Sequence, residues 1–125
     1  MDAAQALADL TEISSQVEAA VLFGEDGEVA ASTLADGDAA SLARAAAELI
    51  DRAAGLGDGE VTQIEASTPG GSVFVVRDGP RRIAATTGPD PTTGLVFYDL
   101  KSALRGSATE AKPRRRRPKK ADDAA

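Results

Sequence analysis

The fold is decided by the central segment AASLARAAAELIDRAA, residues 39–54, which combines helical spacing with little polar surface. Apart from Asp51, its polar side chains recur three or four positions apart and fall on one narrow stripe of a helix. These residues are Ser41, Arg44, Glu48 and Arg52. The apolar residues form a broad face that can cover a sheet and a second flank beside it. The face contains Leu42, Ala45, Ala46, Leu49, Ile50 and Ala53, and the flank contains Ala39, Ala43, Ala47 and Ala54.

A helix that is apolar around most of its circumference is usually buried on more than one side. In a chain with room for one domain, we expect the second side to meet another copy of the chain. The alternative is that alanine, a strong helix former, is simply abundant and exposed here. A strand predicted at 61–68 lacks Pro and Lys, so it could extend the sheet across the same interface. Our candidates for the dimer interface are Leu42, Ala43, Ala46, Ala47, Leu49 and Ile50.

The segments before the central helix predict a helix and a hairpin. Residues 2–15 are predicted to form a helix, because Ala6, Leu10, Ile13 and Val17 recur at helical spacing. An apolar run at 17–23 predicts a buried strand, and a second strand is predicted at 28–33. The Asp-Gly pair between them is a strong hairpin signal. Asp36-Gly37-Asp38 then predicts a break, with Asp38 or Ser41 capping the central helix.

The segments after the central helix predict a meander and a last helix. Gly55 is expected to end the central helix in a left-handed conformation. Strands are predicted at 61–68, 72–77 and 82–87, separated by Pro-Gly-Gly and Asp-Gly turns. The last helix begins near Thr92 or Thr93 and is expected to close at Gly106 and Ser107. Its apolar stripe contains Val96, Phe97, Leu100 and Leu104.

The predicted order is therefore α-β-β-α-β-β-β-α. Two hairpin-type units joined by one helix indicate an α/β fold of the α+β sandwich type, with a five-stranded, mostly antiparallel sheet and flanking helices. We expect this domain to span residues 1–108. From residue 109 the composition cannot build a core, so residues 109–125 are predicted to be a disordered basic tail.

The charge is distributed very unevenly. Seven of the fourteen bases but only two of the twenty acids lie in residues 112–125, so this end carries +5 and the rest of the chain −11. The tail could bind nucleic acid or an anionic membrane, contact an acidic partner or its own acidic body, or stay solvated. Its candidate anion-binding residues are Lys112, Arg114, Arg115, Arg116, Arg117, Lys119 and Lys120. Arg81 and Arg82 are expected to be a solvated strand end or a contact to an acidic partner.

The composition argues against an enzyme. The chain has neither cysteine nor histidine, which removes thiolate ligands and the commonest general base. The glycines at 55–59 follow a helix, whereas a phosphate-binding loop precedes one. The acids at 25–28 are interpreted as a solvated turn. We therefore predict no catalytic, cofactor-binding or metal residues. With no apolar run long enough to span a membrane and no secretory signal, we expect a cytoplasmic protein.

Several motifs in order resemble the bacterial form of the Roadblock (dynein light chain) family. They are 17–28 (VEAAVLFGEDGE), the alanine-rich central helix, 71–76 (GSVFVV) and 93–96 (TGLV), and the resemblance covers about residues 4–106. It implies a five-stranded antiparallel sheet and a homodimer joined through the central helix and a neighbouring strand edge. It also implies a non-catalytic protein that regulates or scaffolds a Ras-like small GTPase or accompanies a signalling complex. No GTPase-contacting residue can be carried over from the family.

Two functions follow as hypotheses. The first is a homodimeric interaction module that binds a Ras-like small GTPase or another signalling protein, without a cofactor. The alternative is a dimer that binds nucleic acid or an anionic surface through its two basic tails. A ligand-sensing domain of similar topology ranks last, because it needs an enclosed pocket and the chain has few large side chains to frame one.

Overall fold

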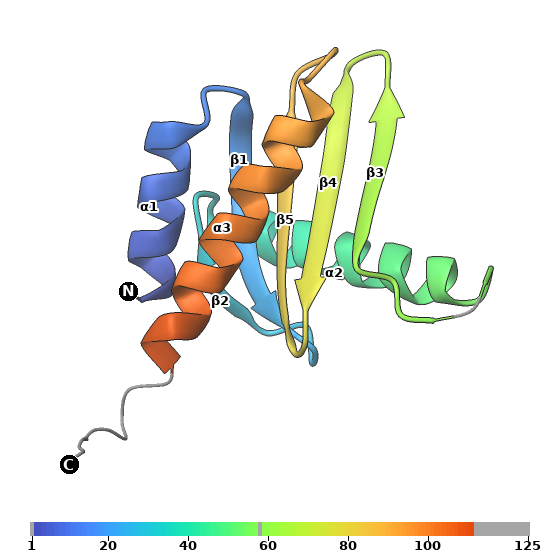
Figure 1. Ribbon diagram of the computed structural model, residues 1–125, viewed down its shortest axis with the longest axis horizontal. Coiled ribbons are helices and arrows are strands. Elements are labelled where there is room, and N and C mark those ends of the chain that lie inside the picture. Colours follow the sequence, from blue (N-terminus) through green and yellow to red (C-terminus); the bar gives the residue numbers. More distant parts are fainter. Residues whose placement is uncertain (1, 58, 112–125) are drawn as a thin grey trace.

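The computed structural model describes residues 2–57 and 59–111, which form a five-stranded antiparallel sheet with three helices (Figure 1). The strand order is β2-β1-β5-β4-β3, so β2 and β3 are the edges. The predicted fold class and element order are confirmed. The elements are α1 (Ala3–Ile13), β1 (Val17–Gly24), β2 (Val29–Ser32), α2 (Asp36–Ala54), β3 (Gln63–Thr68), β4 (Gly71–Asp78), β5 (Arg81–Thr87) and α3 (Thr93–Ala111).

Three turns and one long-range pairing build the sheet. Gly27 and Gly79 adopt positive φ angles of 86° and 63° in the β1–β2 and β4–β5 turns, a conformation that glycine reaches without steric cost. The first hairpin and the meander meet where β1 pairs antiparallel with β5, with Ala20 opposite Ala85. These pairings place segments distant in the sequence side by side at the centre of the sheet.

The sheet separates two hydrophobic cores. Because side chains alternate along a strand, Leu22 and Ile83 point to one face, whereas Val21 and Ala84 point to the other. Helices α1 and α3 cover the first face, and α2 crosses the second (Figure 1). In the first core the rings of Phe74 and Phe97 pack edge to face, with centroids 5.0 Å apart. The predicted stripe of α3, Val96, Phe97, Leu100 and Leu104, is buried there.

Three details of the helix boundaries and stripes differ from the predictions. Ile13 is exposed at the end of α1, and Leu7 takes its place in the core beside Ala6 and Leu10. Helix α2 begins at Asp36 instead of 39, because two carboxylates in its first turn suit the positive end of the helix dipole. Its N-cap, Ala35, makes no side-chain cap. Gly55 ends α2 in a right-handed conformation, so its predicted left-handed stop is wrong.

The predicted end of the last helix is also wrong. Helix α3 continues through Gly106 and Ser107 to Ala111. The Ser107 hydroxyl donates to the Leu104 carbonyl at 2.9 Å, so this polar side chain is satisfied inside the helix and need not end it. Residues 109–111 therefore belong to α3, and the remainder of the predicted tail, 112–125, lies outside the described residues. Within the described part of the chain, no helix is long and apolar enough to cross a membrane.

The turn between β3 and β4 yields a test of the sheet. A side chain at Gly71 would collide with the carbonyl oxygen of Thr87 on β5, whereas one at Gly70 would meet only the Thr68 hydroxyl at 3.8 Å. We expect Gly71→Ala to lower the free energy of unfolding by about 2 kcal/mol, as forced overpacking does. Gly70→Ala should change it by less than about 0.5 kcal/mol. Denaturant unfolding measures both, and equal effects would contradict the close strand approach.

Candidate protein-interaction surface

One stripe of α2 is used entirely within the chain. Ala39, Ala43, Ala46 and Ile50 are buried against Val21, Phe23, Val75 and Ala84 of the sheet. Their spacing of four, three and four residues keeps them on one side of the helix. Ala39 and Ala43, expected on the second flank, therefore face the chain's own sheet, and Ala45, expected on the sheet-covering face, is exposed. Alanine at three of four positions allows the helix to lie close to the strands.

The six dimer-interface candidates divide into two groups. Ala43, Ala46 and Ile50 are buried within the chain and have no surface left for a partner. Leu42, Ala47 and Leu49 remain half-buried at the margin of the same core. Leu42 and Leu49 are seven residues apart and share one flank of the helix, whereas Ala47 lies on the other flank. The candidate surface on α2 is thus narrower than the sequence indicated.

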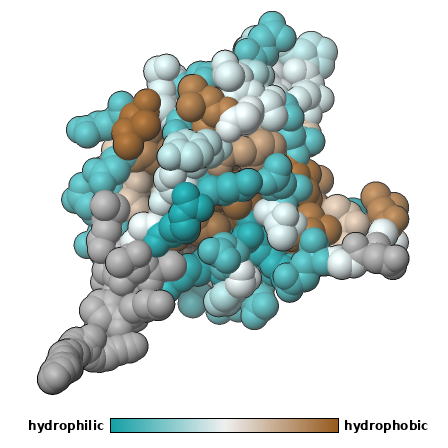
Figure 2. Space-filling model, in the orientation of Figure 1, coloured by the Kyte–Doolittle hydropathy of each residue, from teal (hydrophilic) through white to brown (hydrophobic). Residues whose placement is uncertain are grey.

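Strand β3 supplies the second part of the surface. It is an edge strand whose outer backbone groups have no strand partner among the described residues. Helix α2 packs mainly on β1, β2 and β5, and it buries Val75 of β4, but it covers the side chains toward β3 only partly. Val61, Ile64 and Val73 are half-buried there. Figure 2 shows hydrophobic side chains near the right-hand edge of the molecule, where β3 and the end of α2 lie.

These residues form what we name the α2–β3 surface. It combines residues on both flanks of α2, a partly covered strip of the sheet and an open strand edge. Leu56, just after α2, adds a large apolar side chain that is 88% exposed. Apolar side chains left partly open to solvent in this way are candidates for an interaction site. The members of the α2–β3 surface are Leu42, Ala47, Leu49, Leu56, Val61, Ile64 and Val73.

Arg82 is a site residue whose environment the sequence did not reveal. Its side chain is 6% exposed, so the interpretation as a solvated strand end is wrong for this residue. It lies beside Phe23 and Arg77 on the neighbouring strands. Because Ile83 points toward α1 and α3, the preceding Arg82 points to the face that α2 crosses.

The Arg82 guanidinium is not neutralised within the described residues. Its Nε atom is buried and has no hydrogen-bond partner. The neighbouring Arg77 is paired with Glu60. A buried N–H group without a hydrogen-bond partner costs about 1–3 kcal/mol. Arg82 is thus suited to bind a carboxylate from another molecule. This agrees with the second role that the sequence left open, a contact to an acidic partner.

Within the described residues, no group of three or more His, Cys, Asp or Glu could hold a metal ion. The acids Glu25, Asp26 and Glu28 stand at the tip of the β1–β2 hairpin, and Glu25 and Asp26 are exposed. Asp26 accepts a hydrogen bond from the backbone N–H of Glu28, which is a turn-stabilising role. Residues 55–57 and 59 form the connection that leads into β3, after a helix and before a strand. That order does not suit a phosphate-binding loop.

The fold matches solved structures closely. A Roadblock/LC7 domain from Streptomyces avermitilis superposes with a TM-score of 0.79 at 22% identity, covering 89% of this chain and 98% of that one. The chain has the Roadblock/LC7 fold. The gliding protein MglB from Thermus thermophilus gives a TM-score of 0.67 at 20% identity, covering 88% of both chains. An MglB with a tetrameric arrangement gives 0.65 at 21% identity, covering 86% of this chain and 88% of that one.

Comparisons of the amino-acid sequence, in contrast, find no match. No family model matches the chain, and no curated protein does. The Roadblock/LC7 likeness therefore lies in the arrangement of the elements, and it confirms the fold that the ordered sequence motifs indicated.

Replacing Arg82 tests whether its charge is uncompensated. We expect Arg82→Met to raise the free energy of unfolding of the isolated protein by about 1 kcal/mol, because a buried Nε–H group without a hydrogen-bond partner is exchanged for an apolar side chain of similar length. The half-buried neighbour provides the control, and Arg81→Met should stay within about 0.5 kcal/mol of the parent. Thermal and denaturant unfolding measure both. A loss above about 2 kcal/mol at Arg82 would show that the guanidinium supports the fold.

Proposed function

We propose that this protein is a non-catalytic, homodimeric interaction module that binds and regulates a Ras-like small GTPase or an associated signalling protein in the cytoplasm. The α2–β3 surface carries the proposal, because it leaves apolar side chains and an open strand edge on the same side of the sheet. Two copies that join through this surface cover both features at once.

Dimerisation through this surface has a specific physical basis. Pairing two β3 edges satisfies backbone groups that otherwise face water, and it continues the sheet from one copy into the other. In Figure 1 the end of α2 extends past β3, so this end would lie over the sheet of the second copy. Leu49 and Leu56 would then lose their remaining exposure. An MglB of the same fold has a tetrameric arrangement, which supports self-association.

The GTPase assignment rests on the family resemblance and on the chemistry of the same face. The motifs at 17–28 and 71–76 resemble a family whose bacterial members regulate or scaffold Ras-like GTPases. The nearly buried, unpaired Arg82 supplies a cation that can pair with a carboxylate of such a partner. A partner that contacts both copies would recognise the dimer and discriminate against single chains.

Introducing a carboxylate into the surface tests dimerisation. We expect Leu56→Glu and Leu49→Glu to weaken the dimer at least about ten-fold, because a desolvated carboxylate without a partner is strongly unfavourable. Leu56 is so exposed that its replacement leaves the folded chain intact. Ser41→Glu adds the same charge on the polar stripe of α2 and serves as the matched control. Sedimentation velocity across micromolar concentrations measures the outcome, and a parent protein that sediments as single chains would refute the dimer.

Partner binding is tested separately. We expect the protein to bind at least one Ras-like GTPase encoded in the same genome, loaded with GDP or a non-hydrolysable GTP analogue. Leu56→Glu should abolish binding, and Arg82→Met should weaken it by about ten-fold, as expected when a charged hydrogen bond is lost. Removal of residues 112–125 should leave it unchanged. Isothermal titration calorimetry measures each variant.

The same truncation tests the alternative function. If no GTPase binds, and if the full chain binds duplex DNA or anionic vesicles only when residues 112–125 are present, the proposed function fails. A function that depends on the tail would then replace it.

A further inference from the structure

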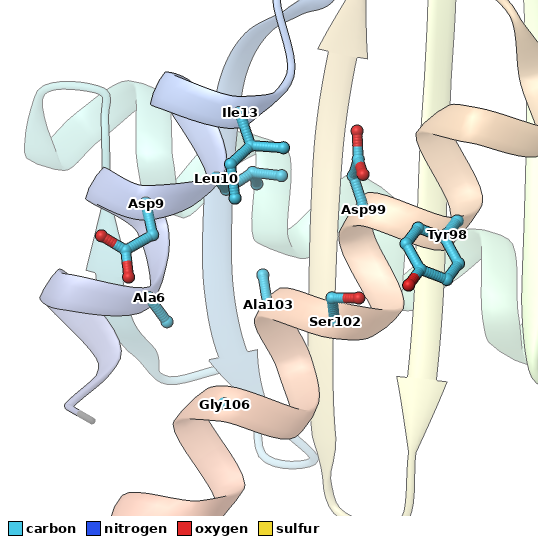
Figure 3. Close-up of a pocket in the computed structure, with 9 residues that line it drawn as sticks. All are labelled: Ala6, Asp9, Leu10, Ile13, Tyr98, Asp99, Ser102, Ala103 and Gly106. Atoms are coloured by element: carbon cyan, nitrogen blue, oxygen red, sulfur yellow. The ribbon is translucent and has the colours of Figure 1, made fainter.

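A groove of about 320 Å³ runs between α1 and α3, on the opposite face of the molecule from α2 (Figure 3). Small side chains line its base, namely Ala6 of α1 and Ala103 and Gly106 of α3. Ile13 and Tyr98 also line it, and they are 72% and 64% exposed. Figure 2 shows hydrophobic side chains near the upper ends of these two helices. We name this feature the α1–α3 groove.

The α1–α3 groove contains an unpartnered carboxylate. Asp99 lines it from α3, is only 8% exposed, and makes no side-chain hydrogen bond or ion pair with the described residues. A second carboxylate, Asp9, lines the groove from α1 and accepts one hydrogen bond, from the Gln5 amide at 2.9 Å. A carboxylate that is this buried is stabilised strongly by a cation, because the surrounding protein screens charge less than water does.

On the α1 side of the groove, all charged side chains are acidic. The first 43 residues contain nine Asp and Glu and no Lys or Arg. The bases Lys101 and Arg105 of α3 line a different hollow, with Arg77 and Thr62. The α1–α3 groove therefore combines apolar walls with acidic groups, which suits a basic segment whose side chains have long aliphatic stems.

The chain carries one such segment, and it is attached beside the groove. Residues 112–125 follow directly after the last residue of α3 and contain seven Lys and Arg. The two helices run in opposite directions, so the end of α3 lies near the beginning of α1 (Figure 1). Tyr98 is about 20 Å back along α3 from Ala111 at 1.5 Å per residue. Fourteen extended residues span up to about 45 Å, which is enough to reverse direction and follow the groove.

We propose that residues 112–125 of the chain occupy its own α1–α3 groove, with an arginine paired to Asp99. The ring of Tyr98 and the side chain of Ile13 contact the aliphatic stems and the prolines of the segment. Pro113 and Pro118 favour an extended backbone, the form in which Pro-rich segments bind grooves with aromatic walls. Covalent attachment supplies an effective concentration in the millimolar range, so even weak contacts are occupied.

Such an occupied groove has a consequence for the basic segment. Arginines that are paired with Asp99 and the acidic side of α1 are not free to neutralise phosphates of nucleic acid or lipid. Binding of a polyanion then competes with the groove, and salt weakens both interactions.

Paramagnetic relaxation tests the proposal on the full chain. Because the chain has no cysteine, Ala121→Cys gives a single attachment site for a nitroxide. We expect the nitroxide to broaden the amide signals of groove residues such as Leu10, Ser102 and Gly106 selectively. The amides of Arg44 and Glu48 on α2, across the sheet, should stay sharp. At about 1 M salt, where the Debye length is about 3 Å, the broadening should decrease. Uniform broadening over the acidic surface would overturn the proposal.

Neutral replacements locate the ion pair. Asp99→Asn should lower the docking equilibrium constant by about five-fold, the loss expected for one ion pair of about 1 kcal/mol. Asp51→Asn, the same change on the exposed side of α2, should have no effect. If Asp99→Asn disturbs the fold, replacement of Arg114–Arg117 by glutamine changes only the segment and should abolish the selective broadening. Persistence of the broadening in the glutamine variant would also refute the pairing.

A mixing experiment identifies which copy provides the segment. Nitroxide-labelled chains without ¹⁵N are combined with unlabelled ¹⁵N chains, so only contacts between copies cause broadening. We expect the groove signals to remain sharp in the mixture. Broadening there would mean that the second copy's segment occupies the groove, which contradicts occupation within one chain.

Discussion

The structure depends on one constraint, which is that a five-stranded sheet has two apolar faces and both need cover. Helices α1 and α3 share one face, whereas α2 alone crosses the other. A single helix cannot cover five strands, and α2 packs mainly on β1, β2 and β5. Toward β3, the same face keeps Ile64 and Val73 only half-buried, although Val75 of β4 is buried. This uneven coverage produces the α2–β3 surface.

The alanines of α2 serve two purposes within that constraint. Ala39, Ala43 and Ala46 allow the helix to approach the sheet closely, so that Val21, Val75 and Ala84 are almost fully buried. The exposed and half-buried alanines on its other sides offer little steric resistance to a second helix. The low polarity of α2 therefore has two physical causes. Some alanines allow close packing on the chain's own sheet, and others leave room for a second helix, and only the packing in the structure shows which alanine does which.

The two faces also differ in their uncompensated charges. On the α2 face Arg82 is a nearly buried cation, and in the groove of the other face Asp99 is a nearly buried anion. Each lacks a counter-charge among the described residues. Their opposite signs assign them different partners, a carboxylate from a bound protein for Arg82 and a base from residues 112–125 for Asp99. The two interactions can therefore occur independently.

The amino-acid sequence by itself determined the type and order of the elements. Apolar, strand-prone runs such as 73–76, Asp-Gly turns and helical stripes are local signals, and the structure follows them. It also determined the apolar stripe of α3. Helix ends were less predictable, because capping competes with dipole and side-chain interactions at Asp36 and Ser107.

Only the tertiary structure decided which helix side is buried, that β3 is an edge, and that Arg82 and Asp99 are enclosed without partners among the described residues. These properties arise from pairing between distant strands and from packing across the sheet, and neither is encoded in local spacing.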